Sequence, residues 1–137
     1  METNFNFRSQ ICTTREQSER LLTLGLKKET ADMCLVDNIY DTYHIKTYSP
    51  NWLTDIPHIP AWSLHRLIEL MPQSIGHLEL AVGSDYAGYY EDRCNSELGM
   101  YWEYVEETPD MFDNIISTIE WLIKEEYFNK EYLENGN

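Results

Sequence analysis

The segment from Thr108 to Tyr127 constrains the fold of this chain more than any other part of its sequence. Its apolar residues recur at the three- and four-residue spacing that places them on one face of a helix. They are Phe112, Ile115, Ile116, Ile119, Leu122 and Ile123. Thr108 suits the N-cap position and Pro109 the first helical position, so we expect a helix from there to about Tyr127. The rest of the chain has to cover this apolar stripe.

Two further helices are predicted nearer the N-terminus. Thr13 and Glu16 have the spacing of a capping box, which predicts a helix over residues 14–24. Gly25 follows it, where a left-handed C-terminal cap belongs. Residues 61–71 form the second helix, because four apolar residues fall on one stripe. These four are Leu64, Leu67, Ile68 and Met71.

The other apolar segments favour strands over helices. β-branched and aromatic residues in the stretch 34–48 predict one or two short strands, and the three prolines of 49–60 predict a rigid loop. Three more strands are expected at 77–82, 86–91 and 100–105. Their connections are too short for parallel crossovers, so the pairing should be antiparallel. In the last strand, strict alternation would place Met100, Trp102 and Tyr104 on one face.

Together these elements predict a single α+β domain over residues 1–137. We expect a small antiparallel sheet with helices packed on one face and a long C-terminal helix. Residues 1–10 are polar enough to form a loose N-terminal arm, and residues 129–137 are expected to fray.

The chain is strongly acidic, with a formal net charge of -14. Residues 106–137 alone contribute -7, whereas residues 1–60 contribute only -2. Binding to nucleic acid or to an anionic membrane needs clustered Lys and Arg, so we expect neither partner. A basic protein partner, or a homodimer, is compatible with the sequence. Solubility alone would also explain the charge.

The cysteines and the hydropathy favour a cytoplasmic protein. Cys12, Cys34 and Cys94 are odd in number and widely spaced, which fits neither a disulfide framework nor a zinc-binding pair. The first ten residues do not have the pattern of a signal peptide. No apolar run approaches the roughly 20 residues that a membrane-spanning helix requires.

Several short strings resemble a family of small uncharacterised bacterial proteins associated with phages and mobile elements. They are Cys12-Thr13-Thr14, Glu16-Gln17-Ser18, Leu21-Leu22, Leu24-Gly25-Leu26, Thr30-Ala31-Asp32-Met33, Ile59-Pro60-Ala61-Trp62-Ser63-Leu64, Leu67, Pro72 and Ile119-Glu120-Trp121-Leu122. The resemblance covers roughly residues 12–122. It implies a single α+β domain and brings no catalytic residues with it.

The aromatic residues of the last two strands are the most suggestive candidates for a binding site. They are Tyr86, Tyr89, Tyr90, Tyr101, Trp102 and Tyr104. A sheet covered by helices on one face buries only alternate residues, so some of these rings should lie on a contact surface for another protein or a second copy. A thick, two-sided core is the structural alternative.

Motifs for catalysis and cofactors are absent from the sequence. Nucleophilic catalysis needs a Ser or Cys near a His and an acid, and His44, His58, His65 and His77 occupy no recognised frame for it. No phosphate-binding glycine loop or metal-ligand spacing occurs, so we expect no cofactor and no metal.

These observations leave three hypotheses of different classes. The first is a non-catalytic accessory protein, phage or mobile-element encoded, that binds another protein. The second is a small enzyme with a His, Cys and acid pocket. The third is a DNA-mimic inhibitor, for which the candidate carboxylates are Glu106, Glu107, Asp110, Asp113, Glu120, Glu125 and Glu126.

Overall fold

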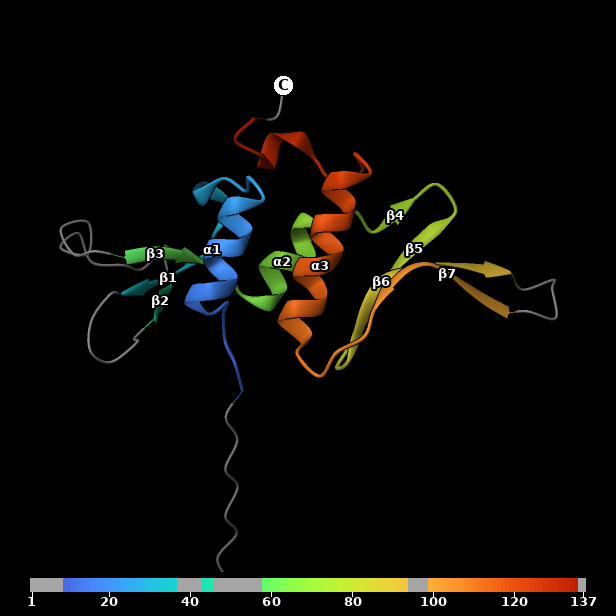
Figure 1. Ribbon diagram of the computed structural model, residues 1–137, viewed down its shortest axis with the longest axis horizontal. Coiled ribbons are helices and arrows are strands. Elements are labelled where there is room, and N and C mark those ends of the chain that lie inside the picture. The colour runs from blue at the N-terminus through green and yellow to red at the C-terminus, as the bar shows by residue number, and fades with distance from the viewer. Residues whose placement is uncertain (1–8, 37–42, 46–57, 94–98, 136–137) are drawn as a thin grey trace, which may run out of the picture.

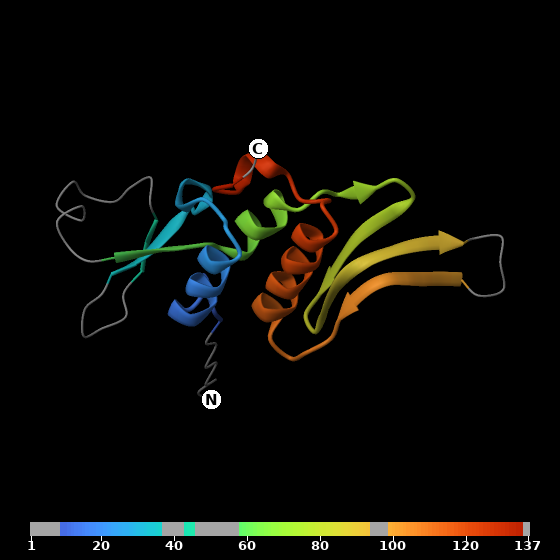
Figure 2. The ribbon, with the colours of Figure 1, turned by 45° about the horizontal axis from the view of Figure 1, so that its top comes forward.

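A computed structural model describes residues 9–36, 43–45, 58–93 and 99–135 of the chain. Its helices form a central layer, with a small sheet on either side of it (Figures 1 and 2). The helices are α1 (Arg15–Thr23), α2 (Leu64–Leu70), α3 (Met111–Lys124) and the short 3₁₀ helices η1 (Lys28–Thr30) and η4 (Lys130–Tyr132). The strands are β1 (Met33–Val36), β2 (Tyr43–Ile45), β3 (His58–Ala61), β4 (Ser74–Ile75), β5 (Leu78–Gly83), β6 (Tyr86–Arg93) and β7 (Gly99–Glu106).

The predicted α+β class, antiparallel pairing and long C-terminal helix are confirmed, but the strands form two sheets instead of one. The first sheet has the order β2-β1-β3 and the second the order β4-β5-β6-β7. Two strands were not predicted. β4 has only two residues, and β3 contains Pro60, which a sheet accepts because β3 is an edge strand. The predicted turns at 37–38 and 41–42 and most of the proline loop lie outside the described residues.

The apolar stripe of α3 forms the centre of the main core, as its spacing predicts. Ile115, Ile116, Ile119 and Leu122 are completely buried. One side of α3 packs on β6 and β7, and the other side meets α1 and α2. Since the same helix contacts both the sheet and the helices, it joins the two sides of the main core.

Both predicted helix N-caps are shifted along the chain. Thr14, not Thr13, caps α1, and Gln17 completes a reciprocal capping box with it. At α3 the cap is Asp110, whose carboxylate accepts from the backbone N–H of Asp113. Thr108 instead bonds the side chain of Asn114. Each observed cap is a polar side chain as good as the predicted one.

A β-bulge overturns the predicted faces of the last strand. Tyr89 pairs with Tyr104, but Tyr90 pairs with Trp102, so Glu103 is an extra residue in β7. A single extra residue turns the side chains beyond it to the opposite face. Trp102 and Tyr104 therefore lie on opposite faces of the sheet, not on the same face.

The predicted fraying of the C-terminal tail is not seen in its described part, residues 129–135. Leu133 forms an isolated antiparallel bridge with Leu26. The backbone N–H of Lys27 donates to the carbonyl of Tyr132, and that of Glu134 donates to the carbonyl of Gly25. Phe128, which directly precedes this segment, is buried in the main core. The polar residues of this tail predicted fraying, but these backbone hydrogen bonds hold the tail against the residues that follow α1.

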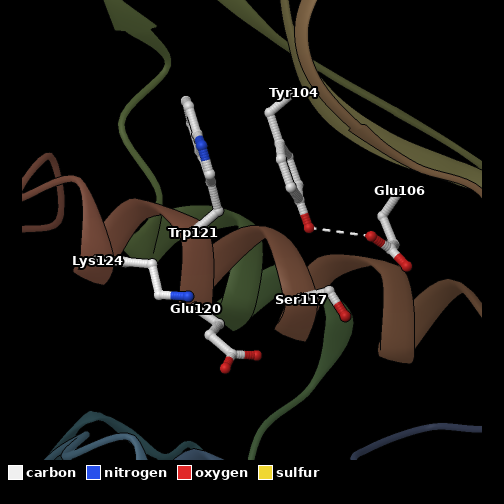
Figure 3. A pocket seen from close by; sticks show the side chains of 6 residues that line it. All are labelled: Tyr104, Glu106, Ser117, Glu120, Trp121 and Lys124. Atoms are coloured by element: carbon white, nitrogen blue, oxygen red, sulfur yellow. Dashed lines mark hydrogen bonds between the residues drawn. The ribbon is translucent and has the colours of Figure 1, made fainter.

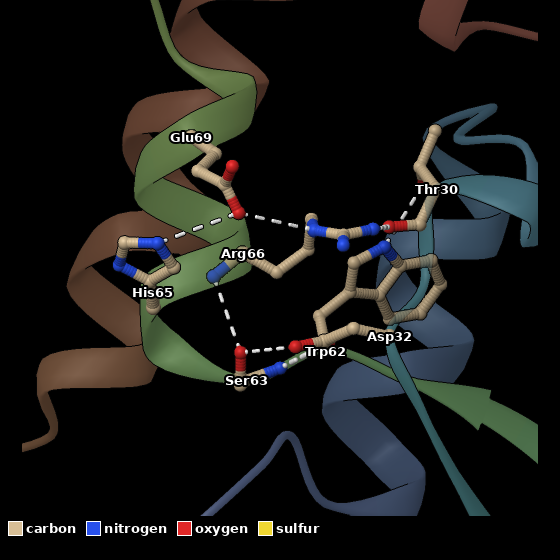
Figure 4. A network of polar contacts seen from close by, with 7 residues as sticks. All are labelled: Thr30, Asp32, Trp62, Ser63, His65, Arg66 and Glu69. Carbon is tan, nitrogen blue, oxygen red and sulfur yellow. Dashed lines mark hydrogen bonds and ion pairs between the residues drawn. The ribbon is translucent and has the colours of Figure 1, made fainter. Parts of the chain in front are cut away.

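A polar network joins the start of α2 to β1 and η1 (Figure 4). Asp32 accepts hydrogen bonds from both the backbone N–H and the hydroxyl of Ser63, the N-cap of α2. Trp62 is completely buried, and its indole N–H donates to the Thr30 hydroxyl at 2.9 Å. Arg66 completes the network by donating to the Thr30 carbonyl. All of these groups have protein partners, so the network has a structural role. It holds the start of α2 against η1 and the start of β1.

Candidate protein-binding surface

The candidate surface is the outer face of the four-stranded sheet, which is turned away from α3. Tyr89 identifies the inner face, because it is completely buried and its ring lies 5.7 Å from that of Trp121 on α3. Side chains alternate along a strand, so Tyr86 and Tyr90 point to the outer face. Directly opposed residues share a face, and the pairing with Tyr90 adds Trp102 to it. Figures 1 and 2 show the described helices on the other side of the sheet.

The rings of Tyr86, Tyr90 and Trp102 form one group, which we call the outer aromatic cluster. The ring centroid of Trp102 lies 5.9 Å from that of Tyr86 and 5.7 Å from that of Tyr90, both in edge-to-face contact. No large side chain stands at the centre of this face, because two small residues, Ala81 and Gly88, are paired there. Half-buried rings beside small residues offer a partner a shallow apolar surface, as in protein interfaces.

The six residues predicted as a contact surface are thus divided between the two faces. Only the outer aromatic cluster lies together on the open face. Tyr104 lies on the inner side and stacks on Trp121, with centroids 4.9 Å apart and planes 12° from parallel. Tyr101 is 47% exposed. Tyr89 is a core residue whose hydroxyl donates to the Pro72 carbonyl at 2.6 Å, so its predicted role in binding is wrong.

Acidic side chains accompany this surface. Glu79 lies next to the outer aromatic cluster and accepts a hydrogen bond from the Tyr90 hydroxyl at 3.1 Å. Asp85 and Glu103 are exposed at the β5–β6 turn and at the bulge. Residues 94–123 contain seven acidic residues and no Lys, Arg or His. The four-stranded sheet therefore lies in a region of negative potential.

A hollow of about 280 Å³ lies on the inner side, between β7 and α3 (Figure 3). We call it the β7–α3 cavity; its lining residues are Tyr104, Glu106, Ser117, Glu120, Trp121 and Lys124. The hydroxyl of Tyr104 donates to Glu106 at 3.0 Å. Burial and this hydrogen bond raise the pKa of Tyr104, so its phenol stays neutral. The cavity thus combines an aromatic wall with carboxylates.

Trp121 lines this cavity but was not among the residues predicted for a contact surface. It falls outside the apolar stripe of α3, and its ring contacts Tyr89, Tyr104 and Tyr127 at the edge of the main core. A large aromatic residue beside, and not within, an apolar stripe is the signal that could have identified it.

The carboxylates proposed for DNA mimicry are engaged in part by α1. The amide of Gln17 donates to Asp113 at 2.8 Å and to Asp110 at 3.3 Å. Arg20 forms an ion pair with Glu120 at 2.8 Å. These three carboxylates hold α1 against α3, which is a structural role.

The register pairs His44 with Cys34 between β2 and β1, but the three histidines whose side chains the structure describes lie at the surface. His58, His65 and His77 are exposed on β3, α2 and the β4–β5 turn, and the side chain of His44 lies outside the described residues. Cys12 borders a hollow of about 320 Å³. The other lining residues are Gln10, Ile11, Thr13, Thr14, Arg15, Leu35 and Val36, with no His or carboxylate among them. Among the residues that the structure describes, this hollow does not bring together the groups for nucleophilic catalysis.

The described part of the chain also holds no group of three His, Cys, Asp or Glu residues that could bind a metal ion. Within the same residues, no helix combines the length and the apolar character needed to cross a bilayer.

The raised pKa of Cys12 leads us to expect that the stability of the fold depends on pH. Burial, reinforced by the charges of Asp32 and Cys34, raises this pKa to about 11. Because the folded state holds the thiol proton more tightly than the unfolded state does, this contribution to stability is complete below the unfolded pKa and is lost as the pH rises toward 11. We expect the free energy of unfolding to fall from pH 9 to pH 11, and Cys12→Ala to make the fall shallower. Urea titrations of the wild type and of Cys12→Ala over this pH range would measure the fall. Equal slopes for the two proteins would contradict the prediction.

Comparison of the chain with models of known protein families, with curated proteins and with solved structures gave no match.

Proposed function

We propose that this protein is a non-catalytic binding protein that docks a basic partner protein on the outer face of its four-stranded sheet. The observation that carries this proposal is the outer aromatic cluster, which lies on the face opposite the helices and within an acidic region. Such a surface offers a partner both apolar area and opposite charge. The resemblance to small phage and mobile-element proteins fits an accessory role of this kind.

Charge favours a cationic partner over a second copy of this chain. A face-to-face dimer would bring together two molecules that each have a net charge of -14. It would also place Glu79 and Glu103 of one copy near those of the other. Like charges in a contact are costly, whereas Lys and Arg of a partner would be attracted.

The proposal predicts selective binding of a basic probe. A suitable probe is a fluorescent ten-residue peptide in which Arg alternates with Val, and its counterpart has Glu in place of Arg. Fluorescence anisotropy should show binding of the Arg peptide alone, and weaker binding at high salt. Trp102→Ala should weaken it by about tenfold or more, as expected for a central aromatic contact.

Ile11→Ala is the control, because Ile11 is 48% exposed and lies outside both the four-stranded sheet and the lining of the β7–α3 cavity. It should leave the affinity unchanged. Three outcomes would contradict the proposal. The first is an equal loss of affinity in the two variants, and the second is no binding of the Arg peptide. The third is a dimer in light scattering that Trp102→Ala dissociates.

A further inference from the structure

We infer that the outer edge of β7 accepts an extended basic segment of the partner as an additional strand of the sheet. This inference rests on the proposed function and specifies how the partner binds. It comes from three features: an open edge, a cavity beside that edge, and the charge of both.

β7 is the long open edge of the described structure. It has eight residues and is the last strand in the order β4-β5-β6-β7, so alternate backbone N–H and C=O groups along it point away from β6. Figure 2 shows it at the margin of the sheet. Backbone groups that point outward from an edge strand in this way are a template for another strand.

The other described edges are protected by features that β7 does not have. β4 has two residues and β2 has three, which is too short for extended pairing. β3 contains Pro60, which cannot donate a backbone hydrogen bond. β7 contains neither Pro nor Lys, the residues that commonly block an edge.

The bulge at Glu103 gives an added strand an aromatic neighbour on each face. Because it turns Trp102 outward while Tyr104 stays inward, alternate side chains of the added strand would lie beside one ring or the other. Those on the inner side would meet the β7–α3 cavity, at the point where Glu106 follows Tyr104. Strand addition obtains affinity from the backbone and specificity from such pockets.

The charge of the edge selects an Arg- or Lys-containing segment. Glu103 and Glu106 belong to β7 itself. In the β7–α3 cavity Glu120 is already paired with Arg20, and Lys124 also lines the wall, so Glu106 is the carboxylate that an incoming cation would meet. An arginine entering this cavity would find the carboxylate of Glu106 beside the rings of Tyr104 and Trp121, which together favour a guanidinium group. Pairing of β7 with the β7 of a second copy would instead bring glutamates of both strands together.

Backbone pairing and face docking can be separated with the Arg-Val peptide and a version methylated on every backbone nitrogen. The methylated peptide keeps its side chains and charge but donates no backbone hydrogen bond. We expect it to bind at least about tenfold more weakly than the unmodified peptide. Hydrogen exchange followed by NMR should show that alternate β7 amides, which exchange rapidly in the free protein, become protected when the unmodified peptide binds.

The cavity is tested by Glu106→Gln, which keeps an acceptor for the Tyr104 hydroxyl. It should weaken binding of the Arg-Val peptide by about fivefold or more. Glu29→Gln removes the same charge from an exposed site on η1 and should change the affinity less than twofold. Equal effects of these two variants would refute the role of the cavity.

The outcomes distinguish this inference from the proposed function. If both peptides bind equally and the β7 amides stay unprotected, while Trp102→Ala still abolishes binding, the edge inference is wrong and docking on the outer face stands. If the Arg-Val peptide does not bind at all, both are wrong. Protection of β7 in the absence of peptide, with a doubled mass in light scattering, would identify a second copy as the occupant and overturn the inference.

Discussion

Replacing Ile116 or Ile119 by Ala should lower the free energy of unfolding by about 2–5 kcal/mol. Both side chains are completely buried on α3, which packs on the four-stranded sheet with one side and on α1 and α2 with the other. A cavity opened there would be bounded by several rigid elements, so the structure could collapse into it only partly. Urea or thermal unfolding followed by circular dichroism would measure the loss.

Leu22→Ala provides the matched control, since Leu22 is 36% exposed on α1. It removes the same aliphatic volume from the surface and should cost less than about 1 kcal/mol. A loss of that small size in both core variants would show that α3 is not the centre of the main core.

Gly88→Ala should destabilise the protein by about 3 kcal/mol or more, although it adds a single methyl group. A Cβ atom at Gly88 would overlap the backbone carbonyl oxygen of Tyr104 and lie 2.8 Å from the Cα atom of Val105. Backbone atoms of a paired strand cannot rotate aside, so β6 and β7 would have to separate. Unfolding measurements on the variant, and the loss of slow amide exchange in β6, would report this effect.

Gly83→Ala is the informative comparison for Gly88→Ala. A Cβ atom there would meet the ring of Tyr86, which is the movable end of a half-buried side chain. The ring can shift at small cost, so the destabilisation should be clearly smaller than at Gly88. Equal losses would mean that the close approach of β6 and β7 is not what requires glycine at residue 88.

The long apolar stripes could be predicted because their burial depends on a local period. The stripe of α3, the antiparallel strands β5, β6 and β7, and the α+β class all follow from spacing within one segment. The glycine at residue 25 was also interpretable, and its φ of 103° is the left-handed conformation expected there.

The helix caps could not be fixed from the sequence because neighbouring residues offer equivalent chemistry. Thr13 and Thr14 are both hydroxyl residues, and each has a suitable side chain three positions later. The tertiary structure decides between them: the Thr13 hydroxyl accepts from the backbone N–H of Trp62 and bonds Ser18, so it is not available to cap α1. A contact 49 residues away leaves no local trace.

The binding surface was only partly predictable for a related reason. The aromatic content of the two strands indicated a contact surface, but the face of each ring depends on the register between strands. The extra residue at Glu103 belongs to the pairing of β7 with β6 and is invisible in either strand alone. Without it, Trp102 would be assigned to the helix-covered face and the outer aromatic cluster would not exist.

The bridge between Leu26 and Leu133 ties the first helix to the last described turn, and this has a consequence for how the protein is made. Synthesis runs from the N-terminus, so α1, α2 and both sheets leave the ribosome before α3 and η4 do. Until then the faces that α3 covers remain bare, and Leu26 has no partner. The domain therefore cannot complete its core until α3 has left the ribosome, and a nascent chain that stalls before residue 111 would expose apolar surface to chaperones or to other nascent chains.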